Sequence, residues 1–291
     1  MHWKRMCIIA SAMAASLASA PLALADQPLP TLVVQQTTLS NGLEVLLHED
    51  HTTPTVSVNL WYHVGSKDEA EGRNGFAHLF EHLMFQGSKH VGEDQFFMYL
   101  ERAGASDKNG TTSLDRTNYY ETVPSNQLEL ALWLESDRMG FLLDHVDQKT
   151  FVSQRSVVLN ERRQNYVDAP YGMVAKFIQE RLYPAGHPYH KLTIGSPKDL
   201  NAATLNDVRN FYKTYYAPNN ATLVVAGDFV PDSAMELIRK YFGPIPKAPE
   251  PSVASTPQPV QISGEKVVYV EASVELPRVY IAYATPPFFA P

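Results

Sequence analysis

The chain has 291 residues, of which 44% are hydrophobic and 19% are charged, a balance that supports a packed core and excludes a disordered chain. Its formal net charge of -7 argues against a nucleic-acid-binding protein, because such proteins need a basic surface. Cys7 is the only cysteine, so the chain forms no intramolecular disulfide and any metal site must use other side chains.

Residues 1–25 have the three parts of a secretory signal peptide. Two basic residues precede an uncharged stretch rich in alanine and leucine, residues 7–24, which closes on the small-residue pattern Ala23-Leu24-Ala25. A membrane anchor is the alternative interpretation, but Pro21 and the many small residues disfavour a spanning helix. We therefore expect cleavage near Ala25, a periplasmic or secreted location, and no membrane segment in the mature chain.

A strand-rich region follows the predicted signal peptide. The dipeptide Asn41-Gly42, typical of tight turns, separates two stretches rich in Val, Thr and Leu at residues 31–39 and 43–48. Residues 55–64 alternate between apolar and polar side chains. We expect three strands here, with one face of the third strand buried.

Helices and further strands make up the rest of this region. Apolar residues at helical spacing predict helices at residues 75–86, 94–103, 126–143, 148–165, 204–215 and 231–241. We expect a strand-turn-strand unit at residues 108–122 and a buried strand at residues 221–226. Strands first, then helices mixed with strands, indicate an α+β fold in which helices flank an antiparallel sheet.

A proline-rich linker is predicted at residues 244–260, which hold six of the 21 prolines. Beyond it, residues 266–270 and 279–283 have the composition of strands, but residues 261–291 are too few to bury a core of their own. We therefore interpret residues 31–243 as one domain and residues 261–291 as the truncated start of a second, similar domain.

The segment NGFAHLFEHLMFQGS, residues 74–88, is the most informative part of the chain. We expect a helix here that is capped by Asn74 and whose apolar residues share one face. The polar side chains on the opposite face are His78, Glu81 and His82.

Two histidines four residues apart project from adjacent turns of a helix, so both rings can bind one ion. Two neutral imidazoles and a third ligand hold Zn²⁺ tetrahedrally and leave the fourth position for water. A carboxylate beside that water can take its proton while the metal lowers the water's pKa. The spacing His-x-x-Glu-His therefore indicates metal-dependent hydrolysis, with His78 and His82 as ligands and Glu81 as general base. A solvated polar helix face without a function is the alternative.

The match to a known pattern extends beyond these five residues. The chain resembles the M16 zinc peptidases, which include pitrilysin, insulin-degrading enzyme and mitochondrial processing peptidase. The resemblance is carried by residues 75–88, 109–119, 157–163 and 215–220. The likeness covers about residues 31–243. It implies an M16 peptidase-like domain for this span.

The resemblance also implies a third metal ligand and a substrate site. In the family a glutamate on a later helix completes the zinc site, and Glu161 occupies the matching position. We therefore expect one Zn²⁺ per chain, held by His78, His82 and Glu161. The family binds an extended peptide along an edge strand, which residues 104–113 match, with Asn109 as a substrate contact.

The expected function is that of a secreted zinc metalloendopeptidase that acts on peptides or unfolded proteins. The family's active unit has two related domains, so the resemblance also implies a second M16 domain or subunit as a partner. The alternative is a non-catalytic or half-enzyme M16 subunit, which binds peptide or a partner and needs a second M16 domain for activity. The intact His-x-x-Glu-His motif favours the enzyme.

Overall fold

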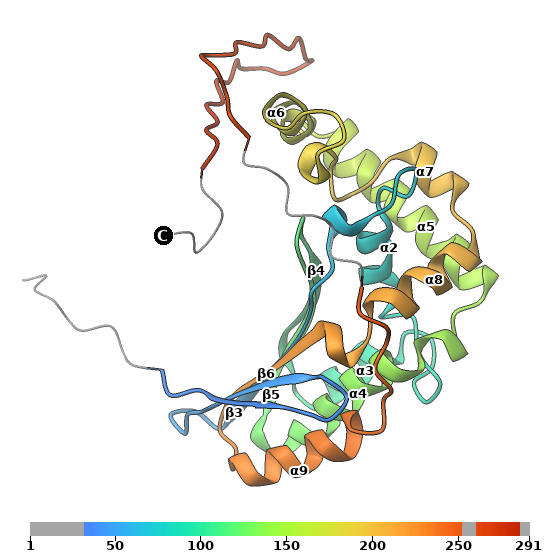
Figure 1. The fold of residues 1–291 in the computed structure, drawn as a ribbon, viewed down its shortest axis with the longest axis vertical. Coiled ribbons are helices and arrows are strands. Elements are labelled where there is room, and N and C mark those ends of the chain that lie inside the picture. The colour runs from blue at the N-terminus through green and yellow to red at the C-terminus, as the bar shows by residue number, and fades with distance from the viewer. Residues whose placement is uncertain (1–31, 252–259, 286–291) are drawn as a thin grey trace, which may run out of the picture. The chain divides into compact units, whose positions relative to one another are not determined.

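The computed structural model describes residues 32–251 and 260–285 (Figure 1). The predicted signal peptide, residues 1–25, and most of the predicted linker, residues 252–259, lie outside the described residues and stay predictions. In the described part of the chain, no helix combines the length and the apolar character that crossing a bilayer requires.

One six-stranded sheet with the order β1-β2-β6-β3-β5-β4 lies at the centre of the fold. Its strands are β1 (Gln35–Thr38), β2 (Glu44–Glu49), β3 (Thr55–Tyr62), β4 (Ser106–Thr112), β5 (Thr117–Pro124) and β6 (Ala221–Gly227). Neighbouring strands pair antiparallel, except that β2 and β6 pair in parallel. The sheet is thus mixed and not wholly antiparallel as expected; the long stretch of chain between β2 and β6 permits their parallel pairing, which a tight turn would not.

The helices confirm the α+β expectation. They are α2 (Phe76–Leu83), α3 (Gln95–Arg102), α4 (Leu128–Phe141), α5 (Gln148–Arg162), α6 (Val174–Leu182), α7 (Pro197–Ala202), α8 (Leu205–Tyr215) and α9 (Pro231–Phe242). The sequence did not predict α6 and α7. Helix α6 has apolar residues at helical spacing, Val174, Phe177, Ile178 and Leu182, but fully buries none of them, and α7 has only six residues.

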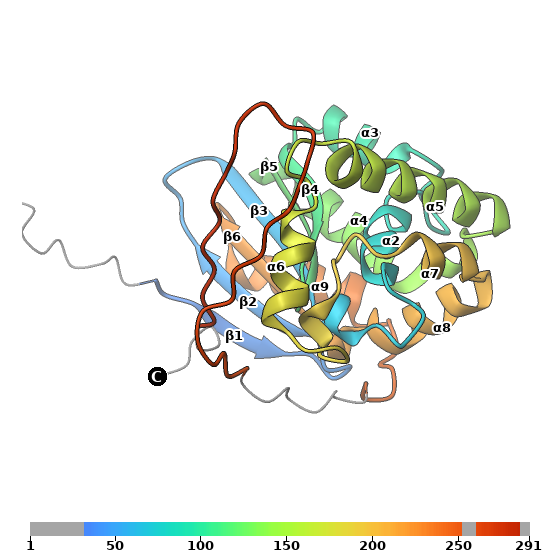
Figure 2. The same cartoon turned by 90° about the horizontal axis from the view of Figure 1, so that it is seen from above.

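Side chains alternate between the two faces of the sheet, as β3 shows. Val56, Val58 and Leu60 are fully buried, whereas Trp61 on the opposite face is 37% exposed. Helices α2, α4 and α9 lie on one side of the sheet in both views (Figures 1 and 2). The core therefore forms between this helical layer and one face of the sheet.

A buried charged cluster ties helix α4 to its surroundings. Arg138 Nη2 lies 3.1 Å from Glu135 Oε1, and neither side chain is more than 1% exposed. The Arg138 guanidinium also lies 3.6 Å from the ring of Phe96, 4.5 Å from that of Tyr119 and 4.8 Å from that of Phe85. Because Phe85 lies two residues after the end of α2, this cluster fixes the C-terminal end of that helix.

Residues 266–270 and 279–283, which were expected to be strands, form no strand in the structure. Val267, Tyr269 and Ile281 are 62%, 94% and 74% exposed. A strand needs a neighbouring strand to pair its backbone N–H and C=O groups, and the described residues offer these segments none. The strand prediction is therefore wrong for this part of the chain as the structure describes it.

Candidate metal centre

Helix α2 begins where both the backbone and the packing require glycine. Gly75 is its N-cap residue with a φ of 105°, and a Cβ atom there would lie 2.8 Å from Cα of Gly195. The prediction that Asn74 caps the helix is wrong. The Asn74 side chain instead donates to Glu69 Oε2 at 2.9 Å and to the carbonyl oxygen of Leu192 at 3.2 Å.

Glu69 takes the place of the expected cap. Its Oε2 accepts the backbone N–H of Gly75 at 2.9 Å, and its Oε1 accepts that of Ala77 at 3.0 Å. The first N–H groups of a helix have no partner within the helix, and the two oxygens of Glu69 accept two of them. Burial raises the pKa of Glu69 to about 8, and these hydrogen bonds oppose that shift. Glu69 therefore anchors the first turn of α2, and no sequence motif had marked it.

The two histidines emerge from successive turns of α2. The ring centroids of His78 and His82 are 4.8 Å apart, and the ring planes are inclined at 81°. His78 is buried and His82 is half-buried. The neighbouring residues Leu79 and Phe80 are fully buried in the core, so the packing of α2 fixes the direction of both rings.

Helix α5 brings the third side chain. It starts at Asp147, whose carboxylate accepts a backbone N–H of the first turn at 2.8 Å, and Val158 on its buried face is fully enclosed. Glu161 lies in the last turn, with a side chain that is 32% exposed. The next residue, Arg162, donates through Nε to the carbonyl oxygen of Gly195 at 3.2 Å. The end of α5 is thus tied to the same glycine that contacts the start of α2.

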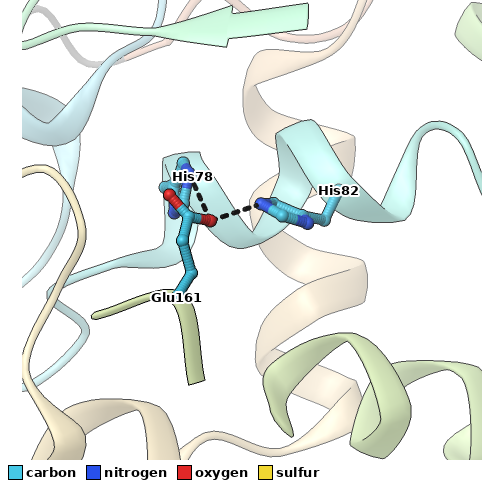
Figure 3. A group of neighbouring side chains, drawn as sticks. All are labelled: His78, His82 and Glu161. Atoms are coloured by element: carbon cyan, nitrogen blue, oxygen red, sulfur yellow. Dashed lines mark ion pairs between the residues drawn. The ribbon is translucent and has the colours of Figure 1, made fainter. Parts of the chain in front are cut away.

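Figure 3 shows that the three side chains point toward one another. Glu161 Oε2 lies 3.3 Å from His82 Nε2 and 3.7 Å from His78 Nε2. One ligand atom from each residue lies within 4.8 Å of the other two. Ligand atoms about 2.0–2.2 Å from a tetrahedral zinc ion are about 3.3–3.6 Å apart. The donor set and its spacing therefore fit Zn²⁺.

The protonation states also suit a metal ion. Burial lowers the pKa of His78 to about 4, so its imidazole is neutral at pH 7. The hydrogen bond with His82 lowers the pKa of the Glu161 carboxyl group, which is therefore ionised. Neutral imidazole and carboxylate are the forms that bind metal ions.

Glu81 lies beside this group without belonging to it. Its Oε2 accepts a hydrogen bond from Thr112 Oγ1 of β4 at 2.6 Å. Burial raises the pKa of Glu81, and the bond from Thr112 opposes that shift. The site thus offers three convergent ligands and, next to them, a separate carboxylate that is able to take a proton.

Asn109 lies on β4, at the edge of the described sheet. Its side chain is exposed, and its Oδ1 accepts the backbone N–H of Gly110 at 2.9 Å. Strand β4 pairs with β5 on one side only, so its outer edge is open to a further strand within the described sheet. No contact in the structure tests a role for Asn109 in substrate binding, which stays a prediction.

Family models and related proteins match this chain. The family model for insulinase (peptidase family M16) matches residues 44–187, and the model for the peptidase M16 inactive domain matches residues 202–290. Zinc protease PqqE of Helicobacter pylori is 32% identical over 258 residues, which cover 87% of this chain and 57% of that protein. The mitochondrial-processing peptidase subunit beta of Saccharomyces cerevisiae is 26% identical and covers 84% of this chain and 52% of its own length.

Solved structures show the same fold. The crystal structure of a protease from Helicobacter pylori matches with a TM-score of 0.73 and 32% identity over 77% of this chain and 53% of that chain. The first half of the periplasmic protease PqqL from Escherichia coli matches with a TM-score of 0.70 and 23% identity over 78% of this chain and 50% of that one. This chain spans about half the length of these relatives. Sequence models, relatives and fold agree that the chain belongs to the M16 family of zinc peptidases.

Proposed function

We propose that this chain carries the catalytic site of a zinc metalloendopeptidase. In this proposal His78, His82 and Glu161 hold one Zn²⁺ per chain, and Glu81 is the general base. The observation that carries the proposal is the convergence of three candidate ligand atoms from α2 and α5. Glu81, also on α2, lies beside them and is hydrogen-bonded to Thr112.

A zinc ion held by His78, His82 and Glu161 would supply a Lewis acid that polarises the scissile carbonyl group and makes water a stronger acid. Glu81 accepts the proton that the attacking water loses as its oxygen bonds to the carbonyl carbon. The Glu81 carboxyl group then gives that proton to the amine nitrogen as the C–N bond breaks. Each cycle thus adds one water across one peptide bond and returns Glu81 to its ionised form.

The substrate is an extended peptide or an unfolded protein that adds to the open edge of β4. Main-chain hydrogen bonds along Ser106–Thr112 hold it, and the exposed amide of Asn109 contributes a side-chain contact. The signal peptide at residues 1–25 directs the chain to the periplasm or outside the cell.

The alternative is a non-catalytic or half-enzyme M16 subunit. Two observations support a need for a second M16 domain: the family match over residues 202–290, and the exposed apolar side chains at residues 266–283. The proposed linker at residues 244–260 would join the two domains.

A reconstitution assay separates the two candidates. Zinc-loaded chain (residues 26–291) is incubated with a quenched fluorescent peptide, alone and with a complementary M16 C-terminal half added in trans. We expect slow cleavage alone and faster cleavage with the added half, because one edge strand orients the substrate incompletely. Full activity of the isolated monomer would contradict the need for a second domain. A zinc-bound chain that stays inactive with the added half would favour the non-catalytic subunit.

A further inference from the structure

Thr112, the last residue of β4, faces helix α2. Its Oγ1 donates to Glu81 Oε2 at 2.6 Å, a short bond of the kind that carboxylates accept. The adjacent Thr111 lies on the other face of the strand, where its hydroxyl group donates to Asn118 Oδ1 at 2.6 Å. Of these two neighbouring threonines, Thr112 alone is directed at the candidate metal centre.

Strand β4 passes close to α2 at this point. A Cβ atom built on Gly110 would lie 3.0 Å from Glu81 Cγ and 2.9 Å from Phe85 Cε2. The stem of Glu81 therefore packs against the strand backbone with no side chain between them. Backbone packing places the stem, and the Thr112 hydroxyl group places the carboxylate.

A glutamate side chain on a helix has several staggered rotamers. Without a fixed partner, the Glu81 carboxylate could turn toward the metal and take the position that water needs. We propose that Thr112 is a positioning residue, which holds Glu81 Oε2 on the strand side and leaves the other oxygen free to accept the proton. This inference rests on the proposed role of Glu81 as general base.

Crystal structures of the metal-free chain test the position directly. Valine has almost the shape of threonine but no O–H donor, so in Thr112→Val we expect the Glu81 carboxylate to move by about 1 Å or more or to divide between rotamers. Thr122→Val is the matched control, because Thr122 bonds Ser57 Oγ at 2.7 Å on the opposite face of the sheet. We expect it to leave Glu81 in place. A Glu81 carboxylate that keeps its position in Thr112→Val would overturn the proposal.

Kinetics of the zinc-loaded chain give the second readout. We expect Thr112→Val to lower kcat by about 10- to 100-fold with KM within about twofold and zinc content unchanged, because a misplacement of about 1 Å costs about 100-fold. Thr112→Ser, which keeps the donor, should restore kcat. In a Glu81→Gln background the valine variant should cause no further loss, because the two residues act as one unit.

Two kinetic results would overturn the proposal: an undiminished kcat in Thr112→Val, or an equal fractional loss in the Glu81→Gln background. A wild-type chain that binds zinc but cleaves no peptide, even with a complementary half, would instead refute the proposed function. In that case the crystal structures still decide whether Thr112 positions Glu81.

Discussion

The two helices that build the candidate metal centre are held by different kinds of contact. Helix α2 is anchored at its first turn by Glu69 and just past its last turn by Arg138, and its apolar face is buried. The last turn of α5 is tied to the rest of the domain by a hydrogen bond from Arg162, and Glu161 stays 32% exposed. The chain then continues into a π-helical segment, Arg163–Val167, that buries no residue.

This difference assigns different roles to the two sides of the site. The core sets the positions of His78, Glu81 and His82 before any metal binds. Glu161 stands on a less constrained helix end, so in the proposed site its position would depend more on the bound metal ion. Changes on the α2 side should therefore have the larger effects on chemistry and metal affinity, and changes near Glu161 the smaller ones.

Glu81→Gln should have the largest effect. The amide keeps the size of the side chain and a polar tip but cannot accept the proton of water. We expect turnover to fall by about 10²- to 10⁴-fold, the range typical of losing a general base, while zinc stays bound. Peptide cleavage and metal analysis on the same sample measure both. Loss of zinc together with activity would make Glu81 a ligand or a folding residue instead.

The two sides of the ligand set should differ in zinc affinity. We expect His82→Ala to weaken zinc binding by more than about 100-fold. Even the mutation of a residue that only hydrogen-bonds a metal ligand typically lowers metal affinity by about 10- to 100-fold. Glu161→Gln should weaken it less, because an amide oxygen remains as a weak ligand without charge. Competition with a chromophoric chelator gives both constants. Wild-type affinity in the Glu161 variant would show that another group is the third ligand.

Glu69→Gln tests the anchor of α2. Glutamine can present only one acceptor oxygen, so either Gly75 or Ala77 loses the partner of its N–H. We expect the free energy of unfolding to fall by about 1–3 kcal/mol, measured by urea denaturation. Glu71→Gln is the control, because that side chain is 94% exposed. Equal stability of the two variants would mean that Glu69 does not anchor the helix.

Arg162→Gln should have the smallest effect. It removes the hydrogen bond to Gly195 at a half-exposed position. We expect the free energy of unfolding to fall by about 0.5–1.5 kcal/mol and the zinc affinity to fall modestly. Arg163→Gln provides the control, since Arg163 is 59% exposed and pairs only with Asp168 in the described chain. A fall in zinc affinity as large as that of His82→Ala would show that α5 is held as tightly as α2.

Elements that pack against the core were predictable from the sequence. The alternation along β3 and the apolar period of α2 reflect burial on one face, and both elements form as expected. Helix α6 was not predicted, although Val174, Phe177, Ile178 and Leu182 recur at helical spacing, and none of them is fully buried. Local rules also favoured Asn74 as the cap of α2, but a carboxylate five residues earlier in the chain, Glu69, competes for the same N–H groups.

The candidate site was predictable only where its residues are neighbours on one helix. The spacing of His78, Glu81 and His82 follows from helix geometry alone. Glu161 came from family resemblance, since no local rule reports which residue of a distant helix meets α2. Thr112 and Glu69 act through tertiary hydrogen bonds that leave no pattern in the sequence.

We expect His78, His82 and Glu161 to bind one zinc ion and to leave Glu81 beside it. Anomalous diffraction at the zinc absorption edge, from crystals of the zinc-loaded chain, tests it most directly. We expect one peak per chain, about 2.0–2.2 Å from Nε2 of each histidine and from an oxygen of Glu161, with Glu81 outside bonding distance. A peak elsewhere, a peak bonded to Glu81 in place of Glu161, or no peak at all would contradict it.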